Sequence, residues 1–251
     1  MKFINNILSV CLAATVLLSF SGCSKVDNNG AADNIRGVGG SLARFTIAGN
    51  YMYVVDAGNL YSFDISTPQN PRQVAVTNVG FNVETIYPFK DKLFIGSQDA
   101  MYIYSLTDPA KPSRLGVASH LRACDPVVAN DSVAYVTVRT GSTCGGNINA
   151  LNVYDVRDPL NPYIQSSINL GNPRGLALKG DVLYLCDDIG GLLVMGLDNP
   201  YEPFELKRFT GDKYFDVIAL DDVLICMIEG GMLIYDIENP FSPVLLSRIT
   251  N

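Results

Sequence analysis

Short apolar runs separated by turn residues fill most of the chain. In the last forty residues the runs "DVIAL", "VLICMI", "MLIYDI" and "VLLSRI" are separated by "DD", "EGG" and "ENPFSP". Runs of this length, rich in Val, Ile, Leu and Tyr and bounded by Gly, Asp, Asn and Pro, predict β-strands. After Gly40 no stretch sustains the period of an amphipathic helix. The pattern therefore predicts an all-β fold.

Pairs of prolines three residues apart divide these runs into repeats. The pairs are Pro68/Pro71, Pro109/Pro112, Pro159/Pro162, Pro200/Pro203 and Pro240/Pro243, at spacings of 41, 50, 41 and 40 residues. A period near 40 is typical of repeat architectures. Four predicted strands in each of five repeats indicate a five-bladed β-propeller of four-stranded antiparallel blades.

The proline pairs also predict how each blade is built. Proline cannot donate to a strand ladder, so "TPQNP" and its counterparts should carry the chain from the third strand to the fourth. The Thr, Asp or Asn before each pair can accept a local hydrogen bond. We expect a propeller over 41–251, with blades at about 44–78, 84–118, 125–169, 174–209 and 215–250. Because no terminal strand is exchanged, blades one and five should close the ring by side-chain packing alone.

The segments "DISTPQNP", "DVRDPLNP" and "DIENPFSP", with the apolar runs before them, resemble the LVIVD-repeat family of exported bacterial propellers. The resemblance extends from about Arg44 to Ile249. Ser105 and Gly196 replace the Asp that usually ends the third strand, so blades two and four depart from the pattern. The resemblance implies a propeller fold and a cell-envelope location, and it implies no catalytic residue.

The N-terminus predicts export. We expect residues 1–22 to be a lipoprotein signal peptide, because they contain Lys2 and an apolar stretch, "ILSVCLAATVLLSF", which is too short to span a bilayer comfortably. "SFSGC" resembles a bacterial lipobox, so we expect acylation, including palmitate, at Cys23 and a flexible tether over 23–40. An ordinary signal peptide is the alternative. Ser24 after the anchor fits the outer membrane, on its periplasmic side or at the cell surface.

The amino-acid composition excludes or disfavours several classes of protein, partner and cofactor. Hydrophobic residues make up 48% and charged residues 17%, which excludes intrinsic disorder. A net charge of −7 without a basic cluster argues against nucleic acid. The absence of Trp argues against WD40 and quinone-dependent propellers, and the single His argues against a His-rich metal site. We expect a monomer without cofactor or metal.

Charged residues recur near the ends of the predicted first strands, which should line the central channel. They are Arg44, Glu84, Asp125, Arg174 and Asp216. Acid–base work on a glycosidic bond needs two carboxyl groups about 5 to 9.5 Å apart, so Glu84, Asp125 and Asp216 suggest a glycan-processing enzyme as one alternative. The other interpretation is that the arginines balance the acids around a wet channel.

Cysteines and blade three give the sharpest expectations. Cys124 and Cys144 fall in neighbouring loops of blade three, where the repeat is expanded, and we predict a disulfide between them. Cys186 and Cys226 should be buried thiols. The same corner gathers His120, Arg122 and Asp125, which we expect to bind the ligand. The sequence favours a non-catalytic binding or scaffold module for an envelope protein or glycan, with a glycan-processing enzyme or a purely structural component as alternatives.

Overall fold

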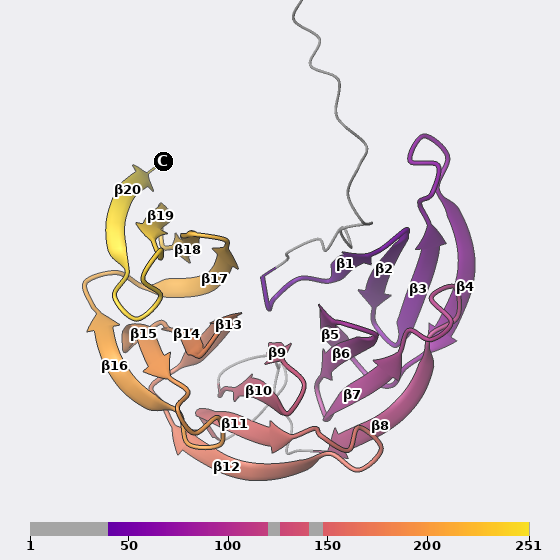
Figure 1. Ribbon diagram of the computed structural model, residues 1–251, viewed down its shortest axis with the longest axis horizontal. Helices are drawn as coiled ribbons and strands as arrows, with labels where there is room; N and C mark the ends of the chain where they lie inside the picture. Colours follow the sequence, from indigo (N-terminus) through magenta and orange to yellow (C-terminus); the bar gives the residue numbers. More distant parts are fainter. Residues whose placement is uncertain (1–39, 120–125, 141–147, 251) are drawn as a thin grey trace, which may run out of the picture. The chain divides into compact units, whose positions relative to one another are not determined.

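A computed structural model describes residues 40–119, 126–140 and 148–250. These residues form twenty β-strands in five separate four-stranded sheets, and every neighbouring pair of strands is antiparallel. In each sheet the strands lie side by side in chain order. The protein is an all-β propeller of five four-stranded blades (Figure 1). Within the described residues no helix has the length and apolar character needed to cross a membrane.

The first sheet contains β1 (Phe45–Ala48), β2 (Tyr51–Asp56), β3 (Asn59–Asp64) and β4 (Arg72–Asn78). The second contains β5 (Val83–Phe89), β6 (Lys92–Ser97), β7 (Ala100–Ser105) and β8 (Ser113–Ser119). The third contains β9 (Val127–Ala129), β10 (Val133–Val138), β11 (Ala150–Asp155) and β12 (Tyr163–Asn169). The fourth contains β13 (Pro173–Lys179), β14 (Val182–Asp187), β15 (Gly191–Gly196) and β16 (Phe204–Phe209). The fifth contains β17 (Tyr214–Leu220), β18 (Val223–Ile228), β19 (Gly231–Asp236) and β20 (Val244–Thr250).

The proline corners join the third and fourth strands of each sheet, as the sequence predicts. The side chains of Asp108, Asp158, Asn199 and Asn239 each accept a hydrogen bond from the backbone N–H two residues later. In the first, second, third and fifth sheets a second turn precedes the corner, because the side chain of the residue that ends the third strand also accepts from the backbone N–H two residues later. Ser105 takes the place of the usual Asp there and still accepts, from the N–H of Thr107. The departure from the repeat in blade two therefore keeps the turn. The third strand of the fourth sheet ends at Gly196, which has no side chain to accept a hydrogen bond.

Tyrosines tie neighbouring sheets together at the proline corners. The hydroxyls of Tyr53, Tyr135 and Tyr184 donate to the carbonyl oxygens of Pro109, Pro200 and Pro240, at 2.8, 2.7 and 2.8 Å. Each of these tyrosines is the third residue of the second strand in its sheet. We call these bonds the tyrosine clamps. Phe94 and Ile225 occupy the corresponding positions in the second and fifth sheets and have no hydroxyl.

The core lies between successive sheets. Four buried apolar clusters are formed by the first with the second sheet, the second with the third, the third with the fourth and the fourth with the fifth. Both faces of the fourth sheet are covered, so every residue of β14 and β15 is buried. The innermost strands β1, β5, β9, β13 and β17 face a common centre (Figure 1).

The expected packing of blade one against blade five is wrong. No strand of the first sheet packs extensively against the fifth within the described residues. The faces that would meet stay partly open: Phe45 is 58% exposed on one side and Met227 is 40% exposed on the other. The segment before β1 instead extends toward the fourth and fifth sheets, where Ser41 lies buried (Figure 1).

Candidate functional site

The predicted channel residues lie at one end of the innermost strands. Arg44 immediately precedes β1, and Glu84, Arg174 and Asp216 lie within three residues of the starts of β5, β13 and β17. We call this the upper end; it also carries the β10–β11, β14–β15 and β18–β19 turns, whereas the proline corners lie at the lower end. His120, Arg122, Cys124, Asp125, Cys144 and Cys23 lie outside the described residues.

Irregular strand pairing affects the direction in which several of these side chains point. The register shifts between Val83 and Thr85, so Glu84 is an extra residue in β5. In β13 the register also shifts between Pro173 and Leu176, so Arg174 and Gly175 lie in a bulge. β-Bulges bend a strand locally and turn a side chain away from its regular direction. The bulges thus occur at the strand positions that carry the charges.

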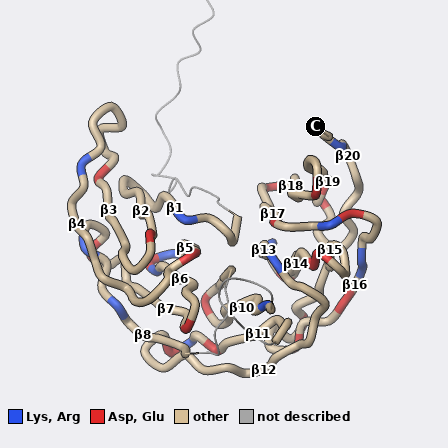
Figure 2. Tube along the Cα trace, turned by 180° about the vertical axis from the view of Figure 1, so that it is seen from behind, with Lys and Arg blue, Asp and Glu red and all other residues tan. Residues whose placement is uncertain are grey.

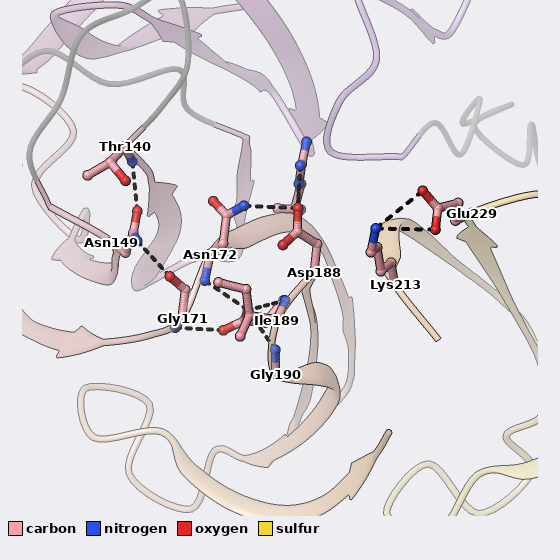
Figure 3. Close-up of polar contacts among 11 residues, drawn as sticks. Thr140, Asn149, Gly171, Asn172, Asp188, Ile189, Gly190, Lys213 and Glu229 are labelled. Atoms are coloured by element: carbon pink, nitrogen blue, oxygen red, sulfur yellow. Dashed lines mark hydrogen bonds and ion pairs between the residues drawn. The ribbon is translucent and has the colours of Figure 1, made fainter. Parts of the chain in front are cut away.

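A buried carboxylate fixes two turns of the fourth sheet at the upper end. Asp187, 1% exposed, accepts hydrogen bonds from the backbone N–H groups of Gly171 and Asn172 at 2.8 Å. It also accepts from Ile189 and Gly190, at 3.0 and 2.9 Å (Figure 3). The segment "DDIGG", which begins at Asp187, therefore forms a turn between β14 and β15. We call residues 170–172 and 188–190 the paired turns.

The paired turns hold a polar cluster beside the channel. Arg174 is ion-paired with Asp188 through Nη2, and the Asn172 side-chain amide donates to the same carboxylate at 2.9 Å (Figure 3). The Arg174 guanidinium also lies over the Phe215 ring, 5.2 Å from its centroid. Burial alone would raise the pKa of Asp188, but the hydrogen bonds from Arg174 and Asn172 hold it below its ordinary value. Asp188 is therefore ionised at neutral pH.

Arg139, at the end of β10, belongs to the same electrostatic neighbourhood. Burial lowers the pKa of Arg139, and the nearby positive charge of Arg174 lowers it further, while Asp188 and Glu84 oppose the shift. Charged residues of the second and fourth sheets thus act on Arg139 of the third. Of these, sequence reasoning placed Glu84 and Arg174 at this end and missed Arg139.

Asn149 connects the third sheet to this cluster. Its Oδ1 accepts from the N–H of Thr140 at 2.7 Å, and its Nδ2 donates to the carbonyl oxygen of Gly171 at 2.6 Å (Figure 3). Thr140 and Asn149 therefore anchor both ends of the expanded turn of blade three. Ile189, 76% exposed, adds an apolar side chain next to these polar groups. Sequence reasoning missed Asn149, although the expansion of the repeat marks its position.

Asp216 does not join the ion pairs that the sequence suggests. Within the described residues its Oδ1 atom is enclosed and has no hydrogen-bond partner. Burial raises the pKa of Asp216 to about 6, and hydrogen bonds from Val217 and Ser41 only partly offset this. Arg174 is paired with Asp188 instead. The interpretation that arginines balance every channel carboxylate is therefore wrong for Asp216.

Other chemistry has little support among the described residues. Cys186 and Cys226 are buried free thiols, as predicted, and burial is the main reason that their pKa is raised. No group of three or more His, Cys, Asp or Glu side chains in the described ranges could hold a metal ion. A pocket of about 450 Å³ lies at the lower end between the first and second sheets, lined in part by Tyr53, Pro88, Lys90 and Pro109.

Charges are mixed over the propeller. Along the described part of the chain, Lys and Arg positions are interspersed with Asp and Glu positions (Figure 2). The upper end follows the same rule, since Arg139 and Arg174 lie with Glu84 and Asp188. The upper end of the third and fourth sheets is therefore a preformed polar surface with both donors and acceptors.

Residues 39–78 match the LVIVD repeat. The match covers the first sheet and confirms the resemblance read from the proline corners. A comparison with curated proteins found no match.

Solved structures of other proteins have the same fold. The computationally designed Ika8 protein has a TM-score of 0.59 at 12% identity, over 82% of this chain and 60% of that one. The Pseudomonas aeruginosa periplasmic gluconolactonase PpgL has a TM-score of 0.59 at 12% identity, over 80% of this chain and 68% of that one. Kluyveromyces lactis Hsv2p has a TM-score of 0.53 at 12% identity, over 80% and 60%. This chain thus spans about 60% to 68% of these proteins, and identities this low show the fold alone.

Proposed function

We propose that this protein is a lipid-anchored module of the cell envelope that binds an envelope protein or glycan without transforming it. Binding takes place at the upper end of the third and fourth sheets. The observation that carries the proposal is the Asp187 carboxylate, which fixes both paired turns with four hydrogen bonds before any ligand arrives. Pre-ordered polar groups lower the entropic cost of binding.

The side chains presented there suit a ligand rich in hydroxyl or amide groups. Arg174 and Asn172 supply donors, Asp188 supplies acceptor lone pairs, and Ile189 supplies apolar contact. Functional residues are commonly placed on loops that a rigid scaffold holds. His120, Arg122 and Asp125 belong to the same proposal from sequence, in the connection that leads into β9.

A direct test is binding of the full chain, in detergent, to a glycan array and to envelope proteins by pull-down. Arg174→Ala and Asn172→Ala should weaken any interaction several-fold or more, because each removes donors from the cluster. The lower-end variants Gln69→Ala and Glu202→Ala are matched controls and should bind like wild type. Lost binding in the controls with intact binding in the upper-end variants would overturn the proposed site, and absence of any saturable ligand would favour a purely structural component.

A second candidate function is glycan processing. The observation that favours it is the pKa of Asp216, about 6, which suits a general acid. Against it, the carboxyl lies beneath Gly40 and Ser41 rather than open to a substrate. Loss of glycan turnover in Asp216→Asn or Glu84→Gln, with binding retained, would support catalysis over simple binding.

The envelope anchor and the disulfide have tests of their own. Cys23→Ala should abolish palmitate incorporation and release the protein from the membrane fraction. For the disulfide, thiol labelling of the unreduced, denatured chain should modify Cys186 and Cys226, which are free thiols in the structure. Cys124 and Cys144 should be labelled only after reduction. Full labelling of both without reductant would exclude the bridge.

A further inference from the structure

Gly40 and Ser41, which lie four to five residues before β1, contact the opposite side of the propeller. Ser41 is 1% exposed, and its Oγ accepts a hydrogen bond from the backbone N–H of Leu176 in β13, at 2.6 Å. The Ser41 hydroxyl in turn hydrogen-bonds the carboxyl of Asp216 in β17. We call Gly40 and Ser41 the strap, because they connect the first sheet to the fourth and fifth. The first and fifth sheets do not pack against each other extensively through their side-chain faces within the described residues.

Two glycines allow the strap to come this close. A Cβ atom on Gly40 would lie 2.3 Å from Oδ2 of Asp216, and one on Gly175 would lie 2.0 Å from Oδ1. Real Cβ atoms do not approach other atoms so closely, so any other residue at either position would push the carboxyl or the strap away. The carboxyl of Asp216 is thus held between two backbone segments.

The environment of this carboxyl opposes its ionised form. Oδ1 has no hydrogen-bond partner, and no Lys or Arg among the described residues pairs with Asp216. Asp216 helps to raise the pKa of two thiols, those of Cys226 on β18 and Cys186 on β14, and both are buried and uncharged. Arg174 on β13 and Lys213 before β17 are paired with Asp188 and Glu229. An ionised carboxylate here would be buried without a counter-charge, which is unfavourable.

We propose that the strap closes over Asp216 while its carboxyl is protonated and releases when the carboxyl ionises. The proton then works as a switch between two states of the segment that enters β1. In the closed state the carboxyl is covered and the first sheet is tied to β13 and β17. In the released state the carboxylate is hydrated and that tie is lost.

The direction of the pH effect follows from the raised pKa of Asp216. Burial raises the pKa of Asp216 to about 6, so the closed state binds the proton more tightly than a released state with an ordinary carboxyl. Closing is therefore favoured most below the ordinary pKa and loses strength as pH rises through about 6. Between pH 5 and pH 7.5 the closed-to-released ratio should fall about tenfold.

Hydrogen exchange measured on the full chain in detergent tests the switch. After correction for intrinsic rates, protection of segments 40–48 and 173–179 should fall about tenfold from pH 5 to pH 7.5 in wild type. Asp216→Asn cannot ionise and should keep equal protection at both values. Glu229→Gln, an exposed change outside the strap, should behave like wild type. Equal protection at both pH values in wild type, or the same fall in Asp216→Asn, would overturn the proposal.

Two further measurements keep the test open if Asp216→Asn does not fold. Carbon-detected titration of the Asp216 carboxyl in wild type should give an apparent pKa near 6, and a value in the ordinary Asp range would overturn the proposal. Ser41→Ala leaves the carboxyl in place but removes the hydroxyl that joins Leu176 to Asp216. It should lower protection of 173–179 at pH 5, and unchanged protection there would show that the strap makes no closure.

Discussion

The fourth and fifth sheets are built from the same repeat, yet their surroundings differ. β14 and β15 are buried at every residue, whereas the fifth sheet buries Leu224 and Cys226 on one face and leaves Met227 exposed on the other. Their upper turns differ too. In the fourth sheet the Asp187 carboxylate accepts four backbone hydrogen bonds from the paired turns. In the fifth sheet the corresponding turns are linked by an exposed ion pair between Lys213 and Glu229. The comparison shows that an apolar repeat position is covered only where a neighbouring sheet follows.

The largest expected effect contrasts the two faces of β18. Leu224 is 0% exposed between the fourth and fifth sheets, so Leu224→Ala should reduce the free energy of unfolding by about 2 to 5 kcal/mol. Ile225 is the next residue and points to the open face. Ile225→Ala should therefore cost less, about 1 kcal/mol. Denaturant unfolding of both variants measures the difference, and equal losses would mean that the open face is covered in solution.

The next effect contrasts the two upper turns. Asp187→Ala leaves four backbone N–H groups without their acceptor, and we expect it to cost about 2 to 3 kcal/mol. Glu229→Ala in the fifth sheet removes only an exposed pair and should change stability little. Thermal unfolding of the two variants separates these outcomes. A loss as large for Glu229→Ala would show that the fifth turn is as firmly held as the fourth.

The tyrosine clamp between the fourth and fifth sheets gives a smaller effect. Tyr184→Phe removes only the hydroxyl that donates to Pro240, so the expected cost is about 1 kcal/mol. Tyr61→Phe is the matched control, since the hydroxyl of Tyr61 has no hydrogen bond to another described residue. Denaturant midpoints compare the two, and an equal, negligible change would mean that the clamp does not contribute.

The smallest effect concerns an exposed pair of the fifth sheet. Arg248 donates to both oxygens of Asp212 at 2.8 Å, and these hydrogen bonds lower the pKa of Asp212. A carboxyl with a lowered pKa stabilises the fold above its ordinary range and loses this contribution as pH falls. Arg248→Ala should therefore lower Tm slightly at pH 7 and not in strong acid. A difference that grows toward acid would contradict this sign.

The repeat made most of the fold predictable. Proline corners, strand order and the direction of the loops follow from local rules that recur every forty residues, and Asp108 and Asn199 accept the hydrogen bonds expected of them. The open faces were not predictable, because the apolar pattern of the fifth sheet is the same whether a neighbour follows or not. The strap was not predictable either: Ser41 contacts Leu176, 135 positions away, and Gly40 contacts Asp216, 176 positions away, and a single sequence carries no signal for such contacts.

The site was predictable only in its position at the upper end. First-strand charges such as Glu84 and Arg174 could be placed there by counting strands. Their pairing could not, because β-bulges decide where each side chain points, and a bulge leaves no clear trace in the residues around it. Arg139 follows β10 and Asn149 precedes β11. Neither belongs to the series of charged residues at the first strands, so only the fold shows that they lie at the cluster.

The tyrosine clamps have a consequence for how such a chain tolerates change. Each clamped corner accepts a hydrogen bond from a tyrosine of the preceding sheet. An insertion beside Pro109, Pro200 or Pro240 would therefore disturb two sheets at once. The one expansion of the repeat falls between β10 and β11, at the opposite end of the blades from the clamped corners. New recognition loops grafted into this protein should therefore be accepted at the upper end and rejected at the clamped corners.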